Sequence, residues 1–444
     1  MSSVPLSEII ESFIPGDWGN ESYSDDTNNN VFCVRGADIV PILNNDFTKI
    51  PTRYISNKSL NEKKLKAGDI VIEKSGGSPV QSTGRAVFIT EKLIEEKSSI
   101  VCSNFCVAIR IKNTWNPKFV FYYWQHLYNS GVFFNFEGKT SGIKNLQLDN
   151  ALQAITIPDY PLSLQKNISD VISIIDRKNA LNREINRNLE ALARQLYDYW
   201  FVQFDFPDEN GRPYKSSGGK MVWNEKLKRE IPEGWNVEEI GTILGKIKGS
   251  IRLQTDEYMA DGKYPIIDQT TGVYYAGFTD NVDAVVQESC VVVFGDHSCA
   301  VKYVNFPFVR GADGTQILKS NDNRISEEYL YFAVKDVKFN KGYARHFSIL
   351  KSSFIIIPNL QISLNFKQHV QRLFNVITGK RQQIIELTKQ RDELLPLLMN
   401  GQVNCDLSIM GVTAPPSGYR KSSLMSRPKG FAQTSFAAAF AVYP

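Results

Sequence analysis

The sequence predicts an α+β protein in which two strand-rich mixed domains are separated by two long helices, packed together as an antiparallel coiled coil. The main observation is a repeat of about 200 residues, in which a strand-rich region ending in Ile-Pro precedes a long helical pattern. A second observation is the polar, turn-rich segment between the two repeats, which is typical of a linker.

The first repeat closes with the strand-like run 154–158, and apolar residues then recur at spacings of three and four from Ile168 to Leu196. The second closes with 355–358, and the same spacing runs from Leu373 to Leu398. Upstream similarities support one shared unit. The matching runs are 70–72 with 291–293, 107–110 with 315–318, and 119–122 with 329–332, and Leu192 and Leu196 align with Leu394 and Leu398.

The two helical patterns, about 42 and 37 residues long, would span roughly 63 and 55 Å. Neither apolar stripe is stable alone in water, so we expect the helices to pair with each other. They must run antiparallel if the two domains lie at opposite ends. The expected divisions are domain 1 at 1–157, helix 1 at 158–202, a linker at 203–233, domain 2 at 234–357, helix 2 at 358–403 and a tail at 404–444.

Composition is that of a soluble globular protein, with 42% hydrophobic and 22% charged residues. The sequence has neither an apolar stretch long enough for a membrane helix nor a signal-peptide pattern, so we expect a cytoplasmic protein without membrane contact. Six cysteines occur without a CxxC pair. Cys102 and Cys106 have no nearby His or Cys to complete a zinc site, so we expect reduced, partly buried thiols.

The net charge of +4 is not concentrated in the strand-rich domains. Residues 1–157 carry 16 basic and 16 acidic groups, and 234–357 carry 13 and 15. Charge alone therefore does not identify a nucleic-acid binder. The tail from 404 is first Pro/Ser/Gly-rich and basic, then apolar, which favours a disordered tail or a frame artefact, with a partner-docking peptide as the alternative.

Several motifs resemble the DNA-specificity (S) subunits of type I restriction–modification systems. The run 188–201 (NLEALARQLYDYWF) is similar to the end of that family's first conserved helix, and 391–403 resembles the close of the second. Phe206-Pro207 and the later 231–235 (IPEGW) resemble the segment that opens the second recognition domain. Each motif is degenerate, but their order and spacing over about residues 1–403 are specific.

The resemblance implies two target-recognition domains, each reading one half of a split double-stranded DNA target. It also implies that the helices set the spacing and dock two methyltransferase subunits, alongside restriction/motor subunits. S-adenosylmethionine, ATP and Mg would bind those partners, and this chain would hold no cofactor. The motifs agree, because the nearest P-loop candidate, 218–221, has Met221 where a hydroxyl is needed, and no catalytic constellation is present.

Reading bases directly requires Arg, Lys, Asn, Gln or acidic side chains on loops that face the DNA grooves. In domain 1 the Gly/Ser-rich loop 74–85 and the loop 138–145 have this composition, and the second resembles the family's DNA-facing turn. The alternative for both is an ordinary solvated loop. The candidate DNA-binding residues of domain 1 are Lys74, Gln81, Arg85, Lys139, Thr140 and Lys144.

In domain 2 the corresponding segments follow Leu244, follow the strand 291–293, and precede the last strand. The candidate DNA-binding residues there are Lys248, Arg252, Gln254, His297, Lys341 and Arg345. His297 could instead be a satisfied surface histidine. No catalytic or metal-ligating residue is predicted. The alternative functions are the recognition region of a self-contained restriction–modification enzyme, or a coiled-coil adaptor without a DNA role.

Overall fold

The computed structural model describes residues 2–76, 81–140, 143–245, 247, 251–288, 290–339 and 345–402. Within this range the chain divides into two compact units. Unit 1 contains the chain up to Arg183 together with the stretch from Gln382, and unit 2 contains Glu184–Arg381. Two long helices, α6 (Leu162–Tyr197) and α10 (Leu360–Met399), each contribute one part to unit 1 and another to unit 2.

Unit 1 is built on an antiparallel sheet whose central strand β5 is buried along its whole length. Helix α4 (Pro117–Asn129) contacts this sheet at its edge strand, and it begins where the Asn116 side chain accepts a hydrogen bond from the Phe119 N–H. Trp124 stacks on Phe133 in the core beneath it. The sheet order is β2 (Ile10–Pro15), β9 (Cys106–Ile111), β5 (Ile70–Glu73) and β7 (Ala86–Phe88).

Smaller elements complete unit 1. Two further three-stranded sheets are β4 (Thr52–Ile55), β3 (Asn29–Val34), β8 (Ile100–Cys102), and β10 (Glu137–Thr140), β11 (Ile143–Leu146), β6 (Ser75–Gly76). The two-stranded ribbon of β1 (Ser3–Pro5) and β12 (Thr156–Pro158) joins the two ends of the strand-rich part. The short helices are α1 (Ile39–Leu43), α2 (Asn57–Lys63), α3 (Glu91–Lys97) and α5 (Leu148–Ala154).

Unit 2 repeats this plan. Its buried central strand is β20 (Val291–Gly295), between β21 (Val301–Val304) and β23 (Thr315–Leu318). Helix α8 (Glu327–Lys335) packs on it and begins at Ser326, whose hydroxyl accepts from the Tyr329 N–H. A ribbon of β15 (Asn236–Glu239) and β24 (Phe354–Ile357) again joins the two ends.

A second sheet in unit 2 has the order β16-β22-β17-β18, with β19 also paired to β22. Its strands are β16 (Arg252–Leu253), β17 (Tyr264–Ile267), β18 (Gly277–Thr279), β19 (Val285–Val286) and β22 (Phe308–Gly311). The remaining elements are the hairpin β13 (Met221–Asn224) and β14 (Arg229–Pro232), with α7 (Ile240–Ile243) and α9 (His346–Ser352).

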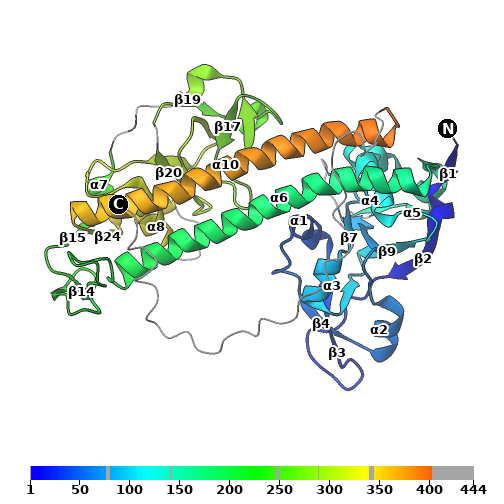
Figure 1. Ribbon diagram of the computed structural model, residues 1–444, viewed down its shortest axis with the longest axis horizontal. Coiled ribbons are helices and arrows are strands. Elements are labelled where there is room, and N and C mark those ends of the chain that lie inside the picture. The colour runs from blue at the N-terminus through cyan, green and yellow to red at the C-terminus, as the bar shows by residue number, and fades with distance from the viewer. Residues whose placement is uncertain are drawn as a thin grey trace. The chain divides into compact units, whose positions relative to one another are not determined.

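The long helices pack antiparallel in both units (Figure 1). In unit 1 the early part of α6 lies against the late part of α10, because Ile168 and Ile172 share a core with Leu395 and Leu398. In unit 2 the late part of α6 shares a core with early α10, with the ring centroids of Tyr197 and Phe366 6.3 Å apart. The predicted fold class is therefore confirmed.

The seam between the helices in unit 1 also contains buried amides. Asn179 donates to the Thr388 hydroxyl over 3.3 Å, and Asn182 donates to the Gln383 side-chain oxygen over the same distance. Such polar pairs in a helix seam favour one register over others, because a slip would leave buried amides without partners.

The segment 203–233, expected to be a linker, contains regular structure. It includes the hairpin β13–β14, and Phe206 lies between Tyr214 and Trp235 with ring centroids 4.7 and 5.0 Å away. Its Gly, Ser and Pro residues form the turns between these parts, so the composition is turn-rich although the segment contributes to the core of unit 2.

Candidate functional site

The two units place a cavity at the same structural position. In each, the central strand pairs antiparallel with its neighbour, as in Ile72 with Val107 and Val293 with Ile317. In each, a short helix, α5 or α9, precedes the closing strand. The cavities, of about 450 and 500 Å³, lie where the central strand ends and the short helix begins. The repeat inferred from sequence therefore extends to these two cavities.

The cavity of unit 1 contains one of the predicted residues, Lys74, which directly follows β5. Its backbone is held on both sides, since its N–H donates to the Phe105 carbonyl at 2.8 Å and its carbonyl accepts from the Leu146 N–H at 2.7 Å. The lining residues are Phe13, Lys74, Val107, Leu146, Gln147, Leu148, Asp149 and Asn150. The three polar residues at its α5 side were not predicted.

Two other predicted cations of unit 1 are bound to buried carboxylates. Arg85 donates two hydrogen bonds to Glu73, at 2.7 and 2.8 Å, and the Glu73 side chain is only 5% exposed. This bidentate contact raises the pKa of Arg85, against the opposing effect of burial. Lys144 pairs with Glu137 at 2.9 Å, and the Glu137 side chain is 7% exposed. Burial acts to raise the Glu137 pKa, but hydrogen bonds from Lys144 and Thr83 outweigh it and lower the pKa.

The other predicted residues of unit 1 occupy different surroundings. Gln81 is exposed. Lys139 and Thr140 belong to β10, paired in register with Lys144 and Ile143 of β11, and the side chains of Lys139 and Thr140 lie outside the described part.

The cavity of unit 2 brings together three of the predicted residues: Arg252, His297 and Arg345. All three side chains are exposed. The complete lining is Arg252, Asp296, His297, Asp313, Gly314, Gln316 and Arg345. Asp313, on the short connection between β22 and β23, and Gln316, on β23 itself, were not predicted from the sequence. Hydrogen-bond donors and acceptors therefore line one opening.

Two polar side chains hold the loops around this cavity. Asp296 is 8% exposed, and its carboxylate accepts from the Phe347 N–H at 2.7 Å while its carbonyl accepts from the His346 N–H at 3.1 Å. Gln269 donates to the Asp313 carbonyl at 2.8 Å and accepts from the His297 N–H at 3.1 Å. The loop after β20 and the loop after β22 are thus tied to each other.

A third arginine lies beside this cavity. Arg310 donates from its Nε to the Thr315 carbonyl at 2.7 Å, and burial together with the charge of Arg252 lowers the pKa of Arg310 to about 10. Gln254 is exposed and lies outside the cavity lining, and its backbone N–H donates to the Glu257 carboxylate at 2.6 Å. Lys248 and Lys341 lie outside the described residues.

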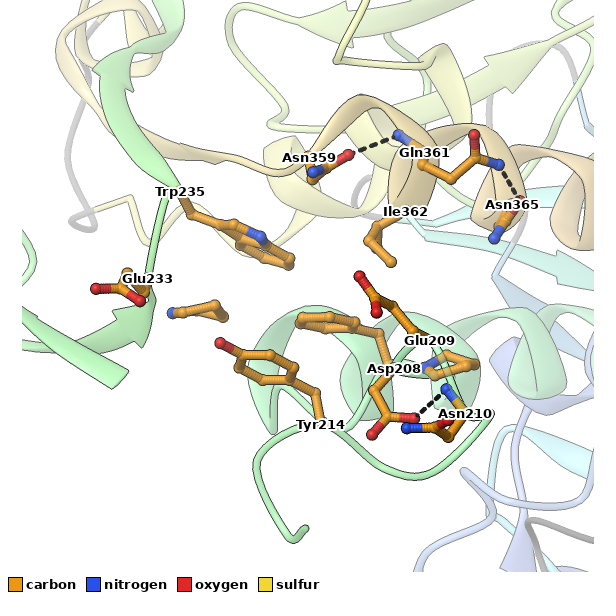
Figure 2. A pocket seen from close by; sticks show the side chains of 13 residues that line it. Asp208, Glu209, Asn210, Tyr214, Glu233, Trp235, Asn359, Gln361, Ile362 and Asn365 are labelled. Carbon is orange, nitrogen blue, oxygen red and sulfur yellow. Dashed lines mark hydrogen bonds between the residues drawn. The ribbon is translucent and has the colours of Figure 1, made fainter. Parts of the chain in front are cut away.

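A third cavity, of about 560 Å³, lies in unit 2 near the start of α10 (Figure 2). Its wall is the aromatic stack of Phe206, Tyr214 and Trp235, and the Glu209 and Ile362 side chains face each other across it. Its described lining includes Asp208, Glu209, Glu233 and Tyr214, and no His, Cys, Ser or Lys.

Of the described cysteines, Cys33, Cys102 and Cys106 are buried and Cys290 and Cys299 are partly buried. Burial raises the pKa of Cys33 to about 12 and that of Cys106 to about 11, which keeps both as thiols. Among the described residues, no group of three or more His, Cys, Asp or Glu side chains is placed to hold a metal ion. Within the same residues, no helix combines the length and apolar character needed to cross a lipid bilayer.

Comparison with known proteins agrees with this architecture. Residues 3–191 match the family model described as the type I restriction modification DNA specificity domain. The type I restriction enzyme MjaIX specificity subunit of Methanocaldococcus jannaschii is 26% identical over 58% of this chain. That match spans 62% of the relative's own length. The HindI specificity subunit of Haemophilus influenzae is 23% identical, covering 84% of this chain and 94% of the relative.

A solved structure shares the fold. The S subunit of a type I restriction–modification system from M. genitalium superposes with a TM-score of 0.51 at 15% sequence identity, covering 89% of this chain and 95% of that one. The family predicted from the conserved-helix motifs is confirmed, as is its assignment to the specificity component and not to a catalytic one. Residues 3–191 therefore carry the type I restriction modification DNA specificity domain, and the chain as a whole is similar to type I restriction–modification specificity subunits.

Proposed function

We propose that the chain reads a bipartite double-stranded DNA target, one half-site with each unit, and scaffolds the methyltransferase and restriction subunits that carry out the chemistry. The observation that supports this most directly is the duplication: one fold occurs twice, with a polar cavity at the same position each time. Because the lining residues differ, each unit would read a different half-site.

The proposed DNA contacts are the predicted residues that reach solvent at these cavities, namely Lys74 in unit 1 and Arg252, His297 and Arg345 in unit 2. Gln81, Gln254 and Lys139 remain candidates from sequence, as do Thr140, Lys248 and Lys341. The strand-rich parts are close to neutral, so partner subunits would supply most of the cationic surface that neutralises phosphates. The chain alone should therefore bind DNA weakly.

Equivalent exposed apolar residues on the long helices support two copies of one partner. In unit 1, Leu162 and Ile174 of α6 are 50% and 43% exposed. In unit 2, Leu364 and Val376 of α10 are each 47% exposed, and they stand at the offset that aligns Leu192 with Leu394. Exposed apolar patches mark interaction surfaces. We assign them to two methyltransferase subunits, which would bind S-adenosylmethionine, while ATP and Mg would bind the restriction subunits. Genomic DNA as target implies the cytoplasm.

Modified-base sequencing of cells with and without this chain, each also expressing the partner subunits, tests the function. We expect methylated adenines in one split motif only when the chain is present. A purified chain that transfers methyl groups or cleaves DNA alone would instead support a self-contained enzyme. Assembly of the complex without any sequence-specific methylation would support the coiled-coil adaptor.

A further inference from the structure

An exposed ion pair at the rim of the unit 2 cavity has the chemistry of a base-pair reader. The Arg252 Nη1 lies 3.5 Å from the Asp313 Oδ1, and the two side chains are 43% and 82% exposed. An ion pair this open to water contributes little to stability. Both groups line the cavity, so a donor fork and a carboxylate are presented side by side.

We propose that Arg252 and Asp313 together recognise one G·C base pair in the half-site read by unit 2. In the major groove guanine presents the acceptors O6 and N7, which match a guanidinium, and its paired cytosine presents the N4 amino donor, which matches a carboxylate. The two base edges are neighbours across the pair, as the two side chains are neighbours on the protein. This proposal rests on the DNA-reading function proposed above and names the substrate feature that this site selects.

The backbone around both residues is held in place. Arg252 lies on β16, which pairs in parallel with β22 so that Arg252 stands opposite Arg310, and the adjacent Leu253 is 4% exposed. The Asp313 carbonyl accepts from Gln269 at 2.8 Å, and the Tyr258 hydroxyl accepts from the Ala312 N–H at 2.8 Å. Residues whose backbone is already fixed before DNA binds lose less conformational entropy on binding.

Two glycines leave room for this arrangement. Gly314 has φ +82°, and a Cβ there would lie 2.7 Å from the His297 ring and 2.8 Å from the Gln269 amide. A Cβ on Gly311 would overlap the Tyr258 hydroxyl. The loop that carries Asp313 therefore has its course fixed by contacts on either side of it.

A phosphate contact is the main alternative for an exposed arginine, and the carboxylates argue against it here. Phosphate oxygens only accept hydrogen bonds and are negative, so Asp313 beside Arg252 would repel them. Asp296 adds a second carboxylate to the same lining. The edge of a G·C pair, in contrast, offers both acceptors and a donor.

The test uses the full chain in complex with its methyltransferase subunits, with modified-base sequencing and competition binding as readouts. Arg252→Ala should relax one G·C position in one half-site, lowering discrimination there roughly 5- to 150-fold and leaving the other half-site intact. Asp313→Ala should relax the same position. In duplexes, 7-deazaguanine at that position should weaken wild-type binding but have no further effect on Arg252→Ala.

Arg324→Ala is the matched control. Arg324 is also a part-exposed arginine of unit 2 paired with a carboxylate, Asp322 at 2.6 Å, but it is not among the residues lining the cavity. We expect its motif to match the wild type. Equal weakening on all sequences with a lower salt slope, relaxation of an A·T position, or an unchanged motif in Arg252→Ala would each overturn the G·C assignment. A wild-type complex that methylates no split motif would instead overturn the proposed function.

Discussion

The two units differ in the exposure of the carboxylates that pair with their candidate DNA-binding cations. In unit 1, Arg85 and Lys144 are bound to carboxylates whose side chains are 5% and 7% exposed. In unit 2, Arg252 faces a carboxylate that is 82% exposed. A cation bound to a buried carboxylate offsets the cost of burying the carboxylate's charge. A cation beside an exposed carboxylate can leave that carboxylate and bind a ligand instead. The exposure of the paired carboxylate, and not the type of loop that carries the cation, distinguishes these ion pairs.

The largest expected effect comes from replacing the strand-rich part of unit 2. Substituting 234–357 with the equivalent domain of a related specificity subunit should change one half of the methylated motif completely and leave the other half unchanged, because each unit has its own core. Modified-base sequencing of cells carrying the hybrid measures this. Changes in both halves would show that the units do not read independently.

The next effect concerns stability. Arg85→Ala leaves Glu73 buried without its cation and should lower the free energy of unfolding by about 3 kcal/mol. Arg345→Ala, at an exposed position, should change it by less than about 0.5 kcal/mol. Urea unfolding of the two variants measures the difference. Equal losses of unfolding free energy in the two variants would show that Arg85 is no more important for stability than the exposed Arg345.

A smaller effect is expected in the salt dependence of DNA binding by the assembled complex. Lys144 is already paired with Glu137, so Lys144→Ala should leave the slope of log K against log salt nearly unchanged. Arg345→Ala should lower that slope by about one if Arg345 contacts a phosphate. Lys139 pairs with Lys144 in the β10–β11 register, and the salt slope of Lys139→Ala serves as the comparison. A loss of about one unit of slope in Lys144→Ala would show that DNA displaces Glu137.

The smallest effect is a pH dependence present in both units. Burial lowers the pKa of His126 in unit 1 and of His369 in unit 2, the latter helped by the charge of Arg372. The unfolded chain therefore takes up these protons first as the pH falls, and stability should decrease below about pH 6.5. Melting temperatures at roughly pH 7.5 and 5.5 should differ less in His126→Gln and His369→Gln than in the wild type. An unchanged difference would assign the pH dependence to other groups.

Sequence periodicity was sufficient for the architecture, because apolar spacing directly reports which helix and strand faces are buried. It located both long helices and the run that forms α8. Ser326 is the N-cap residue of α8, as Asn116 is of α4. It could not identify the partner of Arg85, since Glu73 comes close only through the pairing of β5 with β7. Asp313 was not predicted for a similar reason. It is a candidate only because it pairs with Arg252, and the pairing of β16 with β22 brings these two residues together.

The division of α10 between two cores has a consequence for synthesis on the ribosome. Ile168 and Ile172 of α6 pack with Leu395 and Leu398, and Tyr197 at the end of α6 packs with Phe366. At ~5–20 residues per second, α10, which begins at Leu360, is made on the order of ten seconds after α6, which ends at Tyr197. Until then both units expose part of an apolar stripe to the cell. The nascent chain should therefore depend on chaperones over this interval, and one late helix completes both units.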